Sequence, residues 1–241
     1  MKNIITVILI FFALFMCSIT ATAQSEVGSI PGSFNVTPNG ASAYQIPIEM
    51  PAGAGGLTPH ISIQYNSQGG WGLLGFGWDL NGLSYIAREG CTLAQDGHYS
   101  AVNYSTDDRL SLDGNRMVPI SGAYWGESTQ YGTENETFSK IETVKVGTSM
   151  CFKVTTKDGT ILEYGFTADS RFLPIGSSTP YQWWLNKVRD KNGNYYTINY
   201  KNSGGQIVPQ KIVYSKNEAV TTPGLEIQFV YNSTFASKTT Y

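Results

Sequence analysis

Short stretches in which apolar and polar residues alternate recur along most of this chain. Residues 44–48 (YQIPI) and 61–65 (ISIQY) are examples. Successive side chains of a β-strand point to opposite faces, so this alternation indicates strands with one buried face. Glycine, asparagine and aspartate interrupt the pattern about every 8–12 residues, which is the rhythm of all-β domains. The sequence therefore predicts an all-β fold in which hairpins follow one another in an antiparallel sheet.

Three Asp-Gly pairs mark places where the predicted strands turn back. They are Asp96-Gly97, Asp113-Gly114 and Asp158-Gly159, and this pair readily adopts the positive φ of a type I′ hairpin turn. Residues 190–194 (DKNGN) resemble part of a calcium loop, but the pattern lacks the closing glutamate and the flanking helices of an EF-hand. We therefore expect a further turn there.

A run of glycines and large apolar residues occupies residues 69–80. Glycine permits close approach of neighbouring backbones, and large aromatic rings mostly serve packing. We therefore expect Trp71, Phe76 and Trp78 to fill part of the core.

The N-terminal segment has the pattern of a secretory signal. Lys2 precedes an apolar run over residues 4–15, and small residues lead up to Ala23 and Gln24. This order predicts a signal peptide at residues 1–23, cleaved after Ala23. The apolar run is shorter than the roughly 20 residues that span a bilayer. We expect an exported protein, secreted or at the cell surface, with no stable membrane span after cleavage.

Two cysteines, Cys91 and Cys151, follow the predicted cleavage site. In an oxidising compartment they can form a disulfide. Two buried free thiols are the other alternative, and the sequence leaves both open because it does not reveal whether the side chains meet. In either case one pair of cysteines is too few for a domain of this size, so apolar burial must supply the core.

The residues that carry catalysis or bind metals are sparse. The two histidines, His60 and His98, lack a cysteine or histidine neighbour at metal-ligand spacing. A thiol–imidazole pair would require His98 beside Cys91 or Cys151, and no Gly-x-Ser-x-Gly elbow is present in the sequence. We therefore expect no enzyme activity, no catalytic residue, no cofactor and no metal.

Charge adds little to the list of functions. The net charge is −2 and only 14% of residues are charged, so the chain lacks the basic footprint of a nucleic-acid-binding protein. The carboxylates of Asp107 and Asp108 form one of the densest acidic clusters. We expect them to be surface charges or turn caps, because adjacent residues on a strand point to opposite faces.

Several motifs, taken in their order along the chain, resemble a known family. They are residues 32–41 (GSFNVTPNGA), 55–59 (GGLTP), 72–78 (GLLGFGW), 80–84 (LNGLS), 108–114 (DRLSLDG), 138–141 (FSKI) and 156–165 (TKDGTILEYG). Together they resemble the opening of the Salmonella virulence plasmid B protein family. The same opening occurs in the B component of insecticidal toxin complexes and in many Rhs/YD-repeat proteins. The resemblance runs from about residue 28 to residue 200.

The resemblance implies a division into an SpvB-like N-terminal β domain at residues 24–170 and Rhs/YD-like strand hairpins at residues 171–241. Residues 184–194 (WLNKVRDKNGN) look like the strand–turn–strand unit that leads into Rhs-type repeats. In this family such a sheet winds into a β-shell that encloses a C-terminal effector. The ADP-ribosylation of some members belongs to a separate C-terminal domain, and no motif for it is present in this sequence.

The resemblance predicts a secreted, virulence- and toxin-related structural segment of such a shell. We expect a sequence of this length to end before most of the shell, and to meet the remaining shell or effector chain through an exposed sheet edge. The alternative is an extracellular carbohydrate- or protein-binding β module, which predicts an exposed aromatic cluster near Trp125 or near Trp183 and Trp184. A hydrolase would need converging carboxylates and ranks last.

Overall fold

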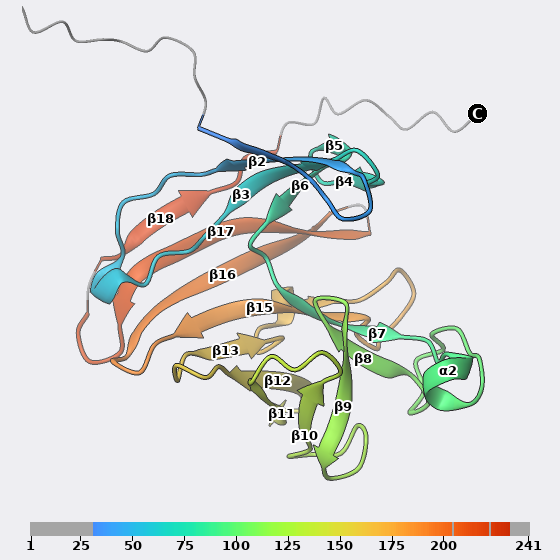
Figure 1. Cartoon of the computed structure of the whole chain (residues 1–241). Helices are drawn as coiled ribbons and strands as arrows, with labels where there is room; N and C mark the ends of the chain where they lie inside the picture. Colours follow the sequence, from blue (N-terminus) through green and yellow to red (C-terminus); the bar gives the residue numbers. More distant parts are fainter. Residues whose placement is uncertain (1–30, 204, 222, 232–241) are drawn as a thin grey trace, which may run out of the picture. The chain divides into compact units, whose positions relative to one another are not determined.

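The computed structural model describes residues 31–203, 205–221 and 223–231. Over these residues the chain is made of antiparallel β-strands with a few short helical turns, which confirms the all-β prediction (Figure 1). The described residues from Gly32 on pack as one unit. The predicted signal peptide lies outside the described residues. Within the described part of the chain, no helix is long and apolar enough to cross a membrane.

A small sheet contains the first six strands in the order β1-β2-β3-β6-β5-β4. Their bounds are β1 (Ser33–Val36), β2 (Ser42–Pro47), β3 (Ser62–Asn66), β4 (Trp71–Gly72), β5 (Gly75–Phe76) and β6 (Trp78–Asn81). The two alternating segments singled out in the sequence form β2 and β3. Tyr44 stands opposite Tyr65, which stands opposite Trp78, so these rings form a row on one face of the sheet.

A large sheet contains the other twelve strands. Their bounds are β7 (Tyr85–Glu89), β8 (Arg109–Leu112), β9 (Asn115–Ser121), β10 (Gln130–Thr133), β11 (Lys140–Val146), β12 (Ser149–Thr155), β13 (Ile161–Tyr164), β14 (Arg171–Phe172), β15 (Gln182–Arg189), β16 (Asn194–Ser203), β17 (Gln206–Asn217) and β18 (Leu225–Gln228). The described residues also contain three short helical turns: η1 (Ala54–Gly56), α2 (Leu93–Asp96) and η2 (Ala168–Ser170).

Strand β15 closes part of the large sheet into a ring. Each strand from β7 to β13 pairs with the next, and β15 pairs with both β7 and β13. We call these eight strands the closed ring. Strand β15 lies beyond the predicted domain boundary at residue 170, and it completes the ring with strands from before that boundary. The division into residues 24–170 and 171–241 stays a prediction.

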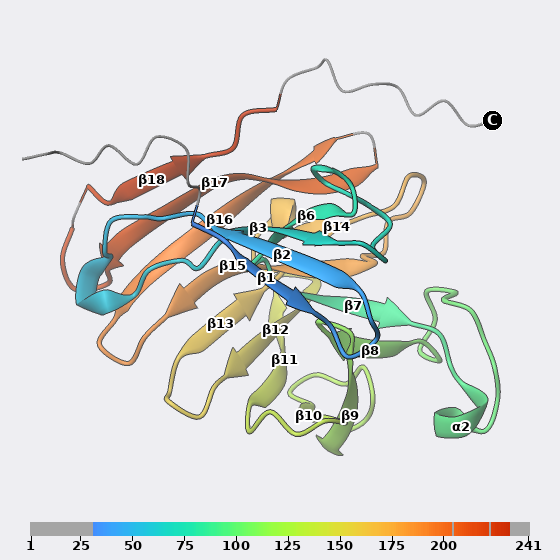
Figure 2. The ribbon, with the colours of Figure 1, turned by 45° about the horizontal axis from the view of Figure 1, so that its top comes forward.

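The remaining strands of the large sheet extend from the ring. Strands β16, β17 and β18 follow β15 in order, and η1 of the small sheet's β2–β3 connection packs on β16 and β17 (Figures 1 and 2). We call β16–β18 together with the small sheet the open part, because β1 and β18 each have a partner strand on only one side among the described residues.

The interior of the ring is filled by large apolar side chains. Trp183 is 1% exposed, and its ring meets that of Phe152 edge to face at 5.1 Å. The ring strands also bury the large side chains of Ile86, Leu110, Met117, Tyr131, Ile141 and Tyr164. Gly165, at φ 75°, lies so close to Trp183 that a Cβ atom there would collide with the indole. The glycine that ends the 156–165 motif is therefore required by packing as well as by backbone geometry.

Three of the four predicted turns are confirmed. Asp113 and Gly114, at φ 50° and 78°, join β8 to β9 with both residues at positive φ. The pair at residues 158–159 joins β12 to β13, and residues 190–194 join β15 to β16, where Asp190 Oδ1 accepts hydrogen bonds from two backbone N–H groups. The positive φ expected of both residues is therefore found at Asp113-Gly114, whereas in the pair at residues 158–159 only Gly159, at φ 87°, has it.

The prediction of a hairpin at Asp96-Gly97 is wrong. Asp96 is the last residue of α2, and Gly97 ends that helix at φ 73°. Thr92 caps the helix, because its hydroxyl oxygen accepts a hydrogen bond from the backbone N–H of Gln95. The same glycine preference for positive φ therefore serves a helix end here.

The prediction that the aromatic residues of the 69–80 run fill the core is wrong for two of the three. Trp71 is 68% exposed and Phe76 is 60% exposed, and the two rings contact each other edge to face at 5.8 Å. Trp78 is half-buried against Tyr65. Strands β4 and β5 form a hairpin of two-residue strands at the end of the small sheet. Side chains at such an end have few neighbours to cover them.

Candidate functional site

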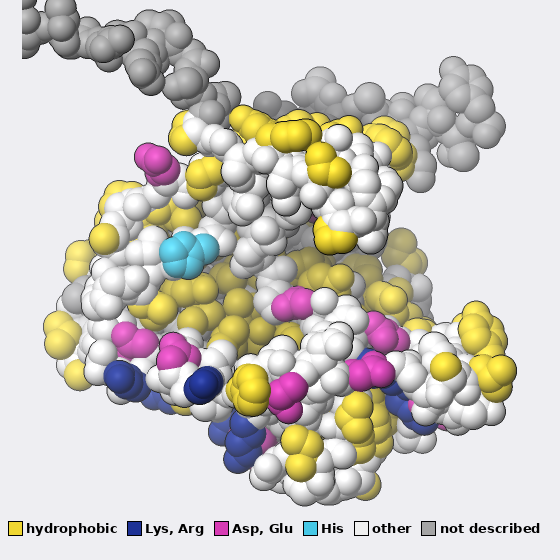
Figure 3. All heavy atoms as spheres, in the orientation of Figure 1, with side chains coloured by type: hydrophobic (Ala, Val, Ile, Leu, Met, Phe, Trp, Pro, Cys, Tyr) yellow, Lys and Arg dark blue, Asp and Glu magenta, His cyan; other side chains and the backbone are white. Residues whose placement is uncertain are grey.

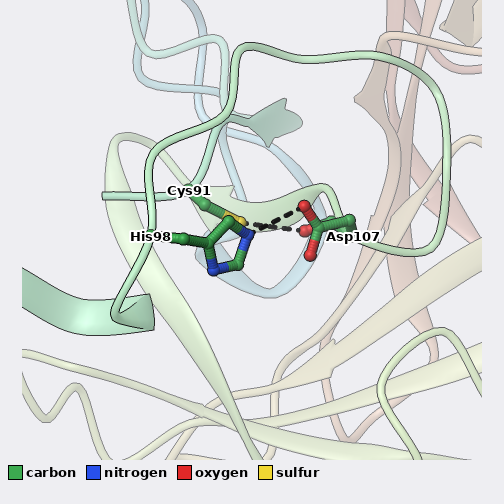
Figure 4. Close-up of side chains that lie close together, drawn as sticks. All are labelled: Cys91, His98 and Asp107. Atoms are coloured by element: carbon green, nitrogen blue, oxygen red, sulfur yellow. Dashed lines mark hydrogen bonds and ion pairs between the residues drawn. The ribbon is translucent and has the colours of Figure 1, made fainter. Parts of the chain in front are cut away.

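Cys91, His98 and Asp107 lie together in the loop between β7 and β8 (Figure 4). Cys91 closely follows the end of β7, His98 follows α2, and Asp107 comes just before β8. One ligand atom from each side chain lies within 4.8 Å of the other two. Sequence reasoning missed this cluster because the folding of a long loop brings the residues together. Their spacing follows no metal or catalytic motif.

The two ring nitrogens of His98, the Cys91 thiol and Asp107 Oδ2 each have a hydrogen-bond partner. His98 Nε2 is 3.0 Å from Asp107 Oδ2, and His98 Nδ1 is 3.2 Å from the carbonyl oxygen of Asp96. The Cys91 thiol is buried and donates to the carbonyl oxygen of Asp107 at 3.2 Å. The hydrogen bond to Asp107 raises the pKa of His98, and the same bond lowers the pKa of the Asp107 carboxyl group.

This geometry does not assemble the thiol–imidazole pair considered from the sequence. Both ring nitrogens of His98 are directed at oxygen atoms of Asp107 and Asp96, and neither is hydrogen-bonded to Cys91. A nucleophilic thiol needs a base within hydrogen-bond reach and access for a substrate. Cys91 is only 1% exposed. His60 is exposed in the connection before β3, outside this cluster.

Cys91 and Cys151 are both buried in the structure, and each is a free thiol. Of the two alternatives left open by the sequence, a disulfide or two free thiols, the structure contains the free thiols. Cys151 lies on β12, and its thiol donates to the carbonyl oxygen of Gly165 at 3.0 Å. Burial raises the pKa of the Cys151 thiol. The two cysteines therefore occupy separate positions, each with its own carbonyl partner.

Asp108, next to the cluster, belongs to a buried ion pair. Its side chain is fully buried and accepts a hydrogen bond from Arg88 at 2.8 Å and another from the backbone N–H of Asn103 at 2.9 Å. The Arg88 guanidinium lies over the ring of Trp125, 4.1 Å from the centroid. The prediction of a surface charge or turn cap is therefore wrong for Asp108, because the fold turns its side chain inward toward Arg88.

A second ionic contact fixes α2 to the ring. Asp96 accepts hydrogen bonds from Arg109 of β8 at 2.8 Å and from Arg116 of β9. Burial acts to raise the pKa of Asp96, but the backbone N–H of Thr92 and the two guanidinium groups outweigh it and lower that pKa to about 2. The loop that carries Cys91 and His98 is thereby tied to two strands.

A cavity of about 650 Å³ opens beside Arg88, where Trp125 and Trp183 form part of its wall. These tryptophans are among those that the binding-module alternative expects to be exposed. Trp183 is buried, while Trp125 and Trp184 are half-buried. The indole N–H groups of the three donate to oxygen atoms of Asp108, Met150 and Gln182. The prediction of an exposed aromatic cluster near these residues is therefore wrong, because the three rings are wholly or partly buried by packing.

Exposed apolar side chains lie on the open part and also on the ring, where Ile120 of β9 is 73% exposed. Figure 3 shows hydrophobic side chains at the end of the small sheet and in the hollow between the two sheets. Phe34 and Val36 of β1 are 66% and 61% exposed, close to the values for Trp71 and Phe76. A further hollow of about 310 Å³ lies between the sheets, with Trp71 and Leu80 on one side and Trp184 and Ile207 on the other.

Comparison with known families now places the chain. The model of the family "Salmonella virulence plasmid 65kDa B protein" matches residues 36–230. The chain therefore belongs to this toxin-related family, as the ordered motifs indicated. The match extends beyond residue 200, where the motifs found in the sequence ended. Among curated proteins, no relative matches significantly.

Solved structures with the same fold come from toxin complexes and from SpvB. The crystal structure of TcdB2-TccC3 matches with a TM-score of 0.65 at 20% identity, over 78% of this chain and 10% of that chain. The Tc holotoxin pore of Photorhabdus luminescens matches with a TM-score of 0.63 at 20% identity, over 77% of this chain and 10% of that chain. The N-terminal domain of the effector protein SpvB from Salmonella typhimurium strain LT2 matches with a TM-score of 0.57 at 19% identity, over 73% of this chain and 66% of that chain. The matched region is about a tenth of the length of the Tc chains.

Proposed function

We propose that this chain is a secreted structural segment that contributes to a β-shell around an effector, and that it has no catalytic role. Membership of the SpvB family supports a toxin-related structural part. The likeness to TcdB2-TccC3 supports a fold that is compatible with one portion of a much larger assembly. The partner is then another shell or effector segment of the same toxin-like system.

The observation that carries the proposal is the unfinished surface of the open part. Strand β1 has four exposed residues and a partner on only one side, and β18 is likewise a terminal strand of its sheet among the described residues. Unpaired strand edges offer free backbone N–H and C=O groups to another chain. Clustered exposed apolar side chains mark surfaces that are covered in an assembly. Added strands satisfy both features at once.

The absence of catalysis is supported by the most reactive cluster in the described part of the chain. The Cys91 thiol is buried and directed at a carbonyl oxygen, so it has neither a base nor an open approach. The carboxylate of Asp108 is neutralised by Arg88 inside the protein. Both groups therefore have structural partners in place of a substrate.

Self-association of residues 24–241 tests the shell proposal. We expect oligomers by light scattering, because β1 and the end of the small sheet present edge and apolar surface together. A Phe34→Ser, Trp71→Ser double variant should shift the protein toward monomer, whereas Leu93→Ser, Tyr99→Ser should not. Leu93 and Tyr99 are somewhat more exposed than Phe34 and Trp71, at 73% and 81%, but lie in the β7–β8 connection. A monomeric wild-type protein with a sharp thermal transition would contradict the proposal.

A carbohydrate-binding module remains the second candidate, because of one hollow at the small sheet. This hollow of about 280 Å³ brings the exposed ring of Trp71 beside the polar side chains of Gln64, Asn66 and Asp79. An exposed aromatic face can stack on a sugar ring, and flanking amide and carboxylate oxygens can accept hydrogen bonds from the sugar's hydroxyl groups. Binding to a glycan array that disappears in Trp71→Ala would favour this function. The absence of glycan binding would leave the shell segment as the better account.

A further inference from the structure

We propose that Cys91, His98 and Asp107 form a zinc site that fastens the β7–β8 loop. This departs from our sequence-based expectation of no metal, and it is independent of the shell proposal. The cluster offers one sulfur, one imidazole nitrogen and one carboxylate oxygen within 4.8 Å of one another. These are the ligand types that bind Zn²⁺, whereas Ca²⁺ and Mg²⁺ take oxygen ligands.

The histidine is already oriented as a metal ligand. His98 Nδ1 faces the carbonyl oxygen of Asp96 at 3.2 Å, which accepts only if Nδ1 carries the proton. Nε2 faces Asp107 Oδ2 at 3.0 Å and donates its hydrogen to that carboxylate, so a metal ion would take the place of this hydrogen. Ligating histidines commonly donate their second ring N–H to a backbone carbonyl in this way. The Asp96 carbonyl therefore keeps a hydrogen on Nδ1, and Nε2 is the nitrogen that binds a metal ion once its own hydrogen is released.

The carboxylate is oriented by a neighbour as well. The hydroxyl group of Ser100 donates to Asp107 Oδ2 at 3.2 Å. Ser100 also forms a bridge with Cys91, because its backbone N–H donates to the Cys91 carbonyl oxygen at 3.3 Å. Ser100 thus holds two of the three ligand residues in register, as outer partners of metal ligands do.

The loop between the ligands is rigidly supported. Thr92 caps α2, and Asp96 at its end is held by Arg109 and Arg116. A ligand set on a supported loop needs little rearrangement to bind a metal. Arg109 Nη1 is 3.9 Å from Asp107 Oδ1 and opposes a cation there, but its Nε is bonded to Asp96. The main ionic partner of Arg109 is thus outside the proposed site.

Binding replaces protons by the metal. The Cys91 thiol and the Nε2 nitrogen of His98 each release a proton to solvent, and the thiolate, the Asp107 carboxylate and the neutral imidazole then bind Zn²⁺. The two negative ligands balance the charge of the ion. The side chains of His98 and Asp107 are 47% and 41% exposed, so water can reach the fourth position of a tetrahedral site.

Metal titration of residues 24–241 tests the site. We expect one Zn²⁺ per chain in competition with a chromophoric chelator, and a thiolate-to-metal charge-transfer band when Co²⁺ replaces Zn²⁺. His98→Gln and Asp107→Asn should each weaken Zn²⁺ binding by more than about 100-fold, beyond the cost of losing an outer partner. Ser100→Ala should weaken it by about 10-fold. His60→Gln, which changes the other histidine, should bind like the wild-type protein.

Two results would overturn the site: no stoichiometric zinc uptake by the wild-type chain, or unchanged affinity in both His98→Gln and Asp107→Asn. Cys91→Ser should remove the charge-transfer band. Because Cys91 is buried and its replacement can disturb folding, the two exposed ligand positions carry the decision. Circular dichroism of each variant checks that the β-sheet spectrum is retained.

Discussion

The closed ring and the open part are built from similar strands, but they differ in whether strand edges are paired and in how far aromatic side chains are exposed. In the ring every strand has a neighbour on both sides, and side chains such as Trp183, Tyr131 and Phe152 are almost completely buried. In the open part β1 and β18 end their sheets within the described residues, and the rings of Trp71 and Phe76 face solvent. Both regions bury aromatic rings, since Tyr200 and Tyr214 of the open part are 4% and 2% exposed, but only the open part leaves the edges of β1 and β18 without a partner strand among the described residues.

The difference follows from closure. A sheet closed on itself satisfies its backbone groups and surrounds its inward side chains, whereas an open sheet needs a second layer to do so. Strand β15 supplies that closure to the ring by pairing with β7 and β13. The ring is therefore the self-sufficient region, and the open part is the region that we propose an assembly completes.

The largest expected effect comes from removing the ring's central indole. Trp183→Ala should lower the free energy of unfolding by about 3–5 kcal/mol, since the buried ring and its hydrogen bond to the Met150 carbonyl are both lost. Trp71→Ala, in the open part, should change it by less than about 0.5 kcal/mol in protein dilute enough to be monomeric, because the side chain is exposed in the single chain. Urea unfolding followed by tryptophan fluorescence and circular dichroism measures both.

Comparable losses in the two tryptophan variants would break the comparison. They would mean that Trp71 is buried in solution, by a second copy or by another part of the chain. Repeating the unfolding at several protein concentrations separates these cases, because only association makes stability depend on concentration.

A smaller effect is expected from the buried ion pair of the ring. Asp108→Asn should destabilise the protein by about 3 kcal/mol, because Arg88 is left as a buried charge without its partner. Glu127→Gln is the matched control, since Glu127 and Lys145 form a pair at 2.7 Å with both side chains more than half exposed. Its cost should stay below about 1 kcal/mol. Equal costs for the two variants would show that Asp108 is accessible to water.

The sequence predicted what depends on neighbouring residues. The alternation at β2 and β3 and the turn at Asp113-Gly114 are local, because side-chain direction and positive φ are properties of a few residues. The pairing of Ile86 with Trp183 joins segments far apart in the chain, and no periodic pattern encodes it. Closure of the ring was therefore not predicted.

The same limit explains the errors about individual side chains. Trp71 has the large apolar side chain typical of a core residue. It is nevertheless exposed, because the β4–β5 hairpin lies at the end of a sheet. Asp108 has the charged side chain typical of a surface residue. It is nevertheless buried, because the fold places Arg88 beside it. The Cys91, His98 and Asp107 cluster depends on the course of a loop around α2. In each case the missing information is tertiary.

The smallest effect tests whether the two regions unfold together. Gly114 in the ring and Gly40 in the β1–β2 turn have φ of 78° and 79°, and at both positions an added methyl group would have open space within 4 Å. Alanine at either site should therefore cost about 1 kcal/mol of backbone strain, without a steric clash. Gly114→Ala should show that cost in global unfolding.

Gly40→Ala should instead show its cost as faster hydrogen exchange in β1 and β2, with little change in global stability. The residues of β1 are all exposed, so this edge of the small sheet can open while the ring stays folded. Hydrogen exchange followed by mass spectrometry measures the local opening, and urea unfolding measures the global loss. An equal global loss in both glycine variants would mean that the small sheet and the ring form one cooperative unit, because strain at the open edge would then be felt by the whole fold.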